Sequence, residues 1–192
     1  MQYSKRGILK NVETLYVVLN VKFITRYSVV FNSLPPQVVF QEVPDEVSLA
    51  FTITGCPLRC EGCHSQDTWN RHLGEPLNLQ SFKSYLTRYQ LMISCVLFFG
   101  GEWCSEQLIE KLICARHLGL KTCLYTGLEK VPQRITQHLD YLKLGAWRSS
   151  RGGLNDINTN QRFYNVNTGE CLNYRFQNQH QITKEKNHAA LI

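Results

Sequence analysis

The feature that most constrains the fold is an alternation of short apolar runs with longer amphipathic ones. Four runs of strand length occupy residues 48–54, 93–99, 120–125 and 141–144. Between them, apolar residues recur at helical spacing in three segments. The first is opened by Pro76, the second has Ser105 as its expected cap and Gly119 as its stop, and the third spans 131–139. Strands that alternate with helices of this length predict an α/β fold with a mostly parallel sheet.

Each predicted strand is followed by a turn that contains small or polar residues. These turns are a cysteine-rich loop after residue 54, then residues 100–102, 126–127 and 145–147. Parallel strands end at the same edge of a sheet, and binding sites in α/β folds lie at that edge. We therefore expect the four turns to form one site.

The first turn holds three cysteines, Cys56, Cys60 and Cys63, in a C-x3-C-x2-C spacing. Iron–sulfur clusters are usually held by four thiolates, so three suggest a cluster with one iron left open. One alternative is a structural zinc site that takes His64 or His72 as its fourth ligand, and another is a set of unconnected thiols. The other five cysteines form no second C-x2-C pair, which favours the cluster; they are Cys95, Cys104, Cys114, Cys123 and Cys171.

The cysteine triplet, followed by the Phe-Phe-Gly-Gly-Glu run at 98–102, resembles the radical S-adenosylmethionine superfamily. The residues at 55–57, 60–64 and Trp69, with the Thr-Asn-Gln-Arg-Phe-Tyr segment at 159–164, are similar to the anaerobic ribonucleoside-triphosphate reductase-activating proteins. The resemblance covers about residues 38 to 176. It implies a partial (β/α) barrel, shorter than a complete eight-fold one.

This resemblance also implies a set of site residues. Cys56, Cys60 and Cys63 would hold a [4Fe-4S] cluster, and S-adenosyl-L-methionine would bind beside it. The residues expected to contact that cofactor are Gly62, His64, Gly100, Gly101 and Glu102, with Glu102 accepting a hydrogen bond from the ligand's ammonium group. Glycine at 62 agrees with the reductase-activating subgroup, whereas His64 stands where many of its members have tyrosine. No catalytic residue is expected beyond these ligands.

The function implied is that of a radical S-adenosylmethionine activase, an oxidoreductase whose substrate is another protein. It would cleave S-adenosylmethionine reductively and generate a glycyl radical on an anaerobic ribonucleoside-triphosphate reductase, with flavodoxin or ferredoxin as the one-electron donor. Two alternatives stay open. One is radical chemistry on a small molecule, as in a 7-carboxy-7-deazaguanine synthase, and the other is a zinc-stapled binding module.

Composition limits the remaining choices. A chain of 192 residues with 43% hydrophobic and 19% charged residues predicts one globular domain. We expect this domain over 38–176, an N-terminal extension over 1–37 that is an edge element or an arm, and a polar tail over 177–192. Within the extension, β-branched and aromatic residues predict a strand or two over 12–24. A net charge of +6 without an aromatic-interleaved basic stripe does not favour nucleic-acid binding. The absence of a leader or long apolar span favours the cytoplasm and no membrane contact.

Overall fold

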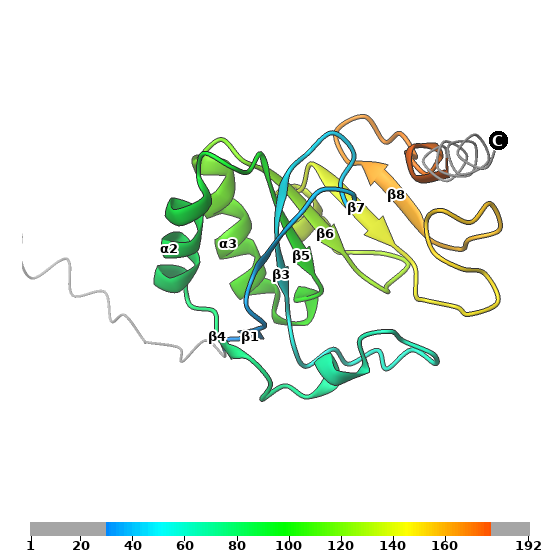
Figure 1. Ribbon diagram of the computed structural model, residues 1–192, viewed down its shortest axis with the longest axis horizontal. Helices are drawn as coiled ribbons and strands as arrows, with labels where there is room; N and C mark the ends of the chain where they lie inside the picture. Colours follow the sequence, from blue (N-terminus) through cyan, green and yellow to red (C-terminus); the bar gives the residue numbers. More distant parts are fainter. Residues whose placement is uncertain (1–29, 178–192) are drawn as a thin grey trace, which may run out of the picture.

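The computed structural model describes residues 30–177 as a mixed α/β domain built on a six-stranded sheet (Figure 1). In chain order its elements are β1 (Asn32–Ser33), β2 (Gln37–Val39), β3 (Ser48–Thr52), η1 (Gln66–Trp69), β4 (Glu75–Pro76), α2 (Leu79–Tyr89), β5 (Cys95–Phe99), η2 (Glu102–Cys104), α3 (Ser105–His117), β6 (Lys121–Tyr125), α4 (Gln133–Thr136), β7 (Tyr141–Leu144) and β8 (Arg162–Asn165).

The sheet has the strand order β2-β3-β5-β6-β7-β8. Its four central strands are parallel, whereas β2 and β8 pair antiparallel with their neighbours. The predicted α/β class and the mostly parallel sheet are therefore confirmed. The strands do not close on themselves, because β2 and β8 form two edges. The curvature of a partial (β/α) barrel stays a prediction.

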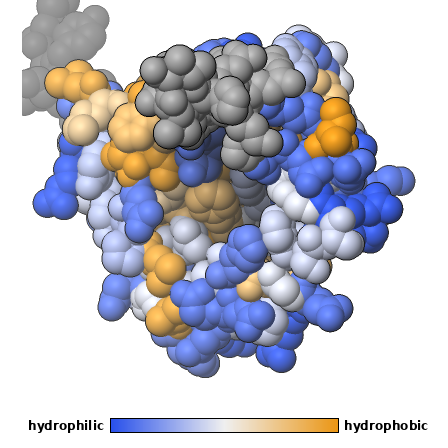
Figure 2. All heavy atoms as spheres, turned by 45° about the vertical axis from the view of Figure 1, so that its right-hand side comes forward, coloured by the Kyte–Doolittle hydropathy of each residue, from blue (hydrophilic) through white to orange (hydrophobic). Residues whose placement is uncertain are grey.

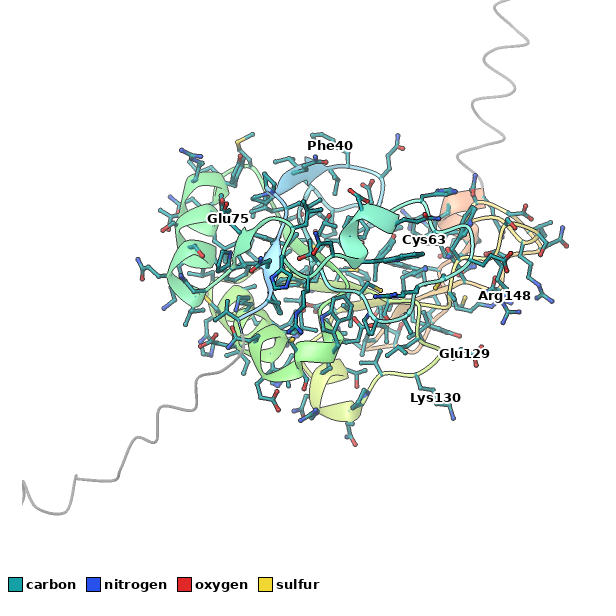
Figure 3. The ribbon with its side chains drawn as sticks, turned by 90° about the horizontal axis from the view of Figure 1, so that it is seen from below. Phe40, Cys63, Glu75, Glu129, Lys130 and Arg148 are labelled. Carbon is teal, nitrogen blue, oxygen red and sulfur yellow. The ribbon has the colours of Figure 1, made fainter. Side chains whose placement is uncertain are left out.

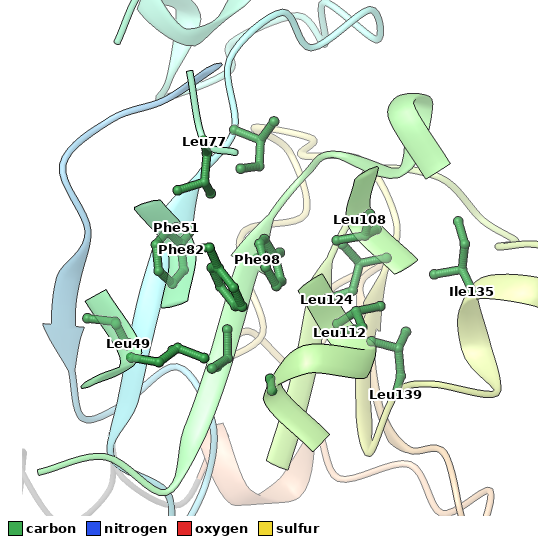
Figure 4. Packing of buried hydrophobic residues seen from close by; sticks show 14 of the residues in the cluster. Leu49, Phe51, Leu77, Phe82, Phe98, Leu108, Leu112, Leu124, Ile135 and Leu139 are labelled. Carbon is green, nitrogen blue, oxygen red and sulfur yellow. The ribbon is translucent and has the colours of Figure 1, made fainter. Parts of the chain in front are cut away.

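The parallel strands carry buried residues on both faces, which explains their continuous apolar sequences. Leu49 and Phe51 of β3 face the helices, while Ala50 between them faces the opposite side. Helices α2 and α3 cover the first face (Figure 1), where Phe82 of α2 packs against Phe51 with ring centroids 5.2 Å apart (Figure 4). On the second face, Phe163 of β8 packs with Val43 and Leu154 from the loops and with Phe176 near the end of the described chain.

Several predicted boundaries differ from the observed ones. Helix α2 begins at Leu79, with the Asn78 side chain accepting a hydrogen bond from the Ser81 backbone, and Pro76 lies in β4. Ser105 was expected to cap α3 but is its first residue, and Cys104 stands at the cap position without a side-chain bond. The helix expected over 131–139 is confined to α4. Each error concerns an end of an element, where local capping decides.

The expected N-terminal extension is described only from residue 30 onward. Within it, Asn32 and Ser33 pair with β4, and Gln37 begins the edge strand β2. Residues 1–29, with the strand or two expected over 12–24, lie outside the described residues, as do 178–192 of the expected tail. In the described part, no helix is long and apolar enough to cross a membrane.

Candidate functional site

The four turns predicted to form one site line a single cavity of about 330 Å³ at the carboxyl ends of the parallel strands. The cavity wall includes all three cysteines of the loop, Gly100 and Glu102 from the turn after β5, Thr126 and Gly127 from the turn after β6, and Trp147 from the loop after β7. Figure 2 shows a hollow with apolar residues in its floor on the side where β7 and β8 come forward.

Contacts at its start and at its middle hold the cysteine loop. At its start, the Gly55 amide donates to the Thr68 carbonyl at 2.7 Å, which ties the loop to η1. At its middle, Leu58 lies over Gly127, where a Cβ would come within 2.7 Å of the Leu58 Cδ1. Arg59 between the first two cysteines adopts a left-handed backbone with φ of 47°, which is uncommon for a residue with a side chain. These contacts tie the loop to η1 and to the turn after β6.

All three loop cysteines are free and partly buried. Burial raises the pKa of the Cys56 thiol, against the hydrogen bonds of the Leu58 and Arg59 backbone, so a metal must displace a proton there. Among residues 30–177, no three His, Cys, Asp or Glu side chains converge on one ion position. A cluster has no such requirement, since each thiolate binds a different iron. The three thiols at the cavity thus fit a cluster as a donor set.

Glu102 brings a carboxylate into the same cavity. Its Oε1 accepts a hydrogen bond from the Thr126 hydroxyl at 2.6 Å, while Oε2 is buried without a protein partner. Burial raises the pKa of Glu102, and the Thr126 hydrogen bond opposes that shift. A buried polar atom without a partner is rare in folded proteins. Oε2 therefore fits a donor on a bound ligand, such as the ammonium group expected from the sequence.

The two glycines before Glu102 shape this turn. Gly100 has φ of 80°, and a Cβ there would lie 2.6 Å from the Trp103 ring, so glycine is required on both grounds. Gly101 has φ of 104° and precedes η2, but it is not among the residues that line the cavity. The turn thus exposes Gly100 and Glu102 to the cavity and uses Gly101 to start the following helix.

Gly62 and His64 lie beside the cavity, outside its lining. The His64 ring packs on Trp147 with centroids 4.2 Å apart, and a Cβ at Gly62 would lie 3.6 Å from the Nε1 of the same indole. Figure 3 accordingly places Cys63 and Arg148 at the same end of the molecule. Gly62 and His64 thus lie next to Trp147, which does line the cavity.

The sequence reasoning missed one charged residue in the cavity, Lys143 of β7. It is buried, its Nζ donates to the Gly145 carbonyl at 2.8 Å, and it lies 6.0 Å from the centroid of the Tyr125 ring. Burial lowers its pKa to about 8, against the opposing effect of nearby Cys60. The sequence contained an indication of this role, because a lysine in the middle of a short apolar strand needs polar groups around its charge when it is buried.

Comparison with known proteins agrees with the cluster interpretation of this cavity. Residues 47–140 match the profile of a 4Fe-4S single cluster domain, a stretch that includes the three cysteines and Glu102. The profile match and the three cysteines at the cavity both support a domain that binds a 4Fe-4S cluster.

The chain is also 34% identical over 79 residues to the pyruvate formate-lyase-activating enzyme of Clostridium pasteurianum. That match covers 38% of this chain and 33% of the enzyme, so the chain corresponds to about a third of the length of this relative.

Proposed function

We propose that this protein is a radical S-adenosylmethionine activating enzyme that generates a glycyl radical on a partner protein. The observation that carries the proposal is one cavity in which three thiols meet a buried carboxylate oxygen without a partner. The match to a 4Fe-4S single cluster domain and the similarity to an activating enzyme support the same class.

In this proposal Cys56, Cys60 and Cys63 hold the cluster. When bound together, the reduced cluster and S-adenosylmethionine supply a 5′-deoxyadenosyl radical that can remove a hydrogen atom from a glycine. The remaining chemistry is positioning by the protein.

Two side chains fit the ammonium and carboxylate groups on the methionine part of S-adenosylmethionine. Glu102 Oε2 accepts a hydrogen bond from the ammonium group, held in place by Thr126 through Oε1. Lys143 places a positive charge on another wall of the cavity, where it can face the carboxylate. Opposite charges on two walls orient an amino acid in one direction only, which is how a site fixes the reacting atom of its ligand.

We further propose an anaerobic ribonucleoside-triphosphate reductase as the protein substrate. The segment at 159–164, which resembles the reductase-activating proteins, reaches the cavity through Gln161, a residue of its wall. Thr159 is buried and accepts a hydrogen bond from the Gln161 amide at 3.1 Å, which fixes that approach. Under this proposal the substrate is a protein, whereas radical enzymes such as 7-carboxy-7-deazaguanine synthases act on small molecules.

The test begins with anaerobic purification of the full chain. We expect about four irons per chain, and release of 5′-deoxyadenosine when dithionite and S-adenosylmethionine are added. Cys60→Ala should abolish the release, whereas Cys171→Ala, at an exposed cysteine outside the cavity, should preserve it. Stoichiometric zinc and intact S-adenosylmethionine would refute the enzyme and favour a zinc-stapled module.

The substrate is tested separately. Adding a candidate anaerobic reductase should give a glycyl radical signal in electron paramagnetic resonance. Cleavage that depends on a small molecule, with no signal on any candidate reductase, would favour the small-molecule alternative instead.

A further inference from the structure

A second cavity, of about 620 Å³, lies on the other side of the cysteine loop. Its wall and that of the first cavity share Cys56 and Trp103, which stand between the two spaces. One expected cluster ligand is therefore accessible from a surface that is not the proposed reaction cavity. We call this second cavity the outer groove.

The outer groove is cationic. Arg59 and Arg71 line it and are both exposed, and no Asp or Glu is among its described lining residues. These residues come from the cysteine loop and from the segment after η1, which the Gly55–Thr68 hydrogen bond holds together. A concave surface lined by one sign of charge raises the association rate of an oppositely charged partner.

The N-terminal part of the chain is also rich in positive charge. Residues 1–29 hold five Lys or Arg and one acidic residue, while 30–177 hold 14 and 13. This positive segment joins the described domain at Val30, which itself lines the outer groove. The sequence charge of residues 1–29 therefore has the same sign as the two arginines of the outer groove.

We infer that the outer groove is the docking surface for an acidic one-electron carrier, and that Cys56 is the point where the electron enters. The inference rests on the proposed function only in requiring the cluster. In a reduced flavodoxin, the anionic flavin hydroquinone loses one electron and becomes the neutral semiquinone. The cluster gains that electron, passing from the 2+ to the 1+ state, and no proton moves. The donor thus docks without opening the reaction cavity to solvent.

The test measures cluster reduction without S-adenosylmethionine, so that it does not depend on radical chemistry. Full-length, cluster-loaded protein is mixed anaerobically with flavodoxin hydroquinone, and bleaching of the cluster absorbance gives the second-order rate constant. Arg71→Glu should lower this constant by about tenfold at low salt, and the difference should shrink at high salt. Reduction by dithionite and the iron content should not change.

The matched control is Arg88→Glu, which makes the same charge change on α2 at an exposed residue outside the outer groove. Equal rates for the two variants would overturn the inference, as would a chain that takes up no cluster. A single-stranded oligonucleotide that binds the protein through Arg71, with no effect of Arg71→Glu on reduction by flavodoxin, would also overturn it. Slow reduction of Arg71→Glu with no later cleavage of S-adenosylmethionine would uphold the docking surface and refute only the proposed function.

Discussion

Replacing Glu102 with glutamine should stabilise the empty protein and weaken its ligand binding. The carboxylate keeps the Thr126 hydrogen bond on Oε1 but has no protein partner on Oε2. Because burial raises its pKa, folding favours the protonated form. Deprotonation therefore costs stability as the pH rises above the ordinary value of 4.5, and this cost is complete above the raised pKa.

The magnitude follows from the buried oxygen. Leaving a buried group unpaired costs about 1–3 kcal/mol, and a neutral amide should recover about 1 kcal/mol of it at pH 8. In the opposite direction, losing a charge-assisted hydrogen bond to an ammonium group costs about 1.5–3 kcal/mol, or about a 10- to 100-fold weaker affinity for S-adenosylmethionine. The same substitution thus shifts stability and binding in opposite directions.

Two measurements check this prediction. Urea unfolding of the cluster-free protein between pH 4 and pH 8 should show a gain for Glu102→Gln that appears only as the pH rises. Anaerobic calorimetry on the loaded protein should show the loss of affinity. Glu106→Gln serves as the control, because Glu106 is an exposed carboxylate in the first turn of α3, four residues after Glu102. A variant of Glu102 that binds as tightly as the parent would refute the assigned role.

Three further results are expected. Cys60→Ala should lower the iron bound per chain, measured by colorimetric assay, whereas Cys171→Ala should leave it unchanged. The affinity for S-adenosylmethionine should fall as the pH rises through about 8, where folded Lys143 loses its charge, and Lys143→Met should remove this dependence in calorimetry. Because the pKa of Lys143 is lower in the folded protein, the stability cost of burying its charge should disappear as the pH rises from about 8 to 10.5. Phe82→Ala should cost about 3–5 kcal/mol in urea unfolding because the ring is fully buried, while Phe40→Ala, at an exposed ring, should cost under about 0.5 kcal/mol.

The central strands could be predicted because their sequences satisfy two faces at once. The run at 93–99 places Val96 and Phe98 toward the helices and Leu97 toward the other side, so it is apolar throughout. The same reasoning placed the four turns at one edge of the sheet. It succeeded because parallel strands leave little freedom in where their ends meet.

The antiparallel edges and Lys143 could not be predicted in the same way. Strand β8 is held by contacts outside its own sequence, namely its pairing with β7 and the bond from the Phe163 amide to the Asn173 side chain at 2.8 Å. Its sequence, Arg-Phe-Tyr-Asn, has only one fully buried residue and gives a weak pattern. Lys143 appeared as an interruption of an apolar strand, and only the three-dimensional arrangement places it beside Cys60.

The order of strands in the sheet has a consequence for biosynthesis. From β3 to β8, every strand of the sheet lies next to its predecessor in the chain. A nascent chain can therefore build the sheet from one edge to the other as it leaves the ribosome. The cysteine loop emerges with the first parallel strand, whereas Lys143 arrives with the last, so the thiols are in place well before the wall that faces them. The time between the two events gives an incoming cluster access to its ligands before the cavity is complete.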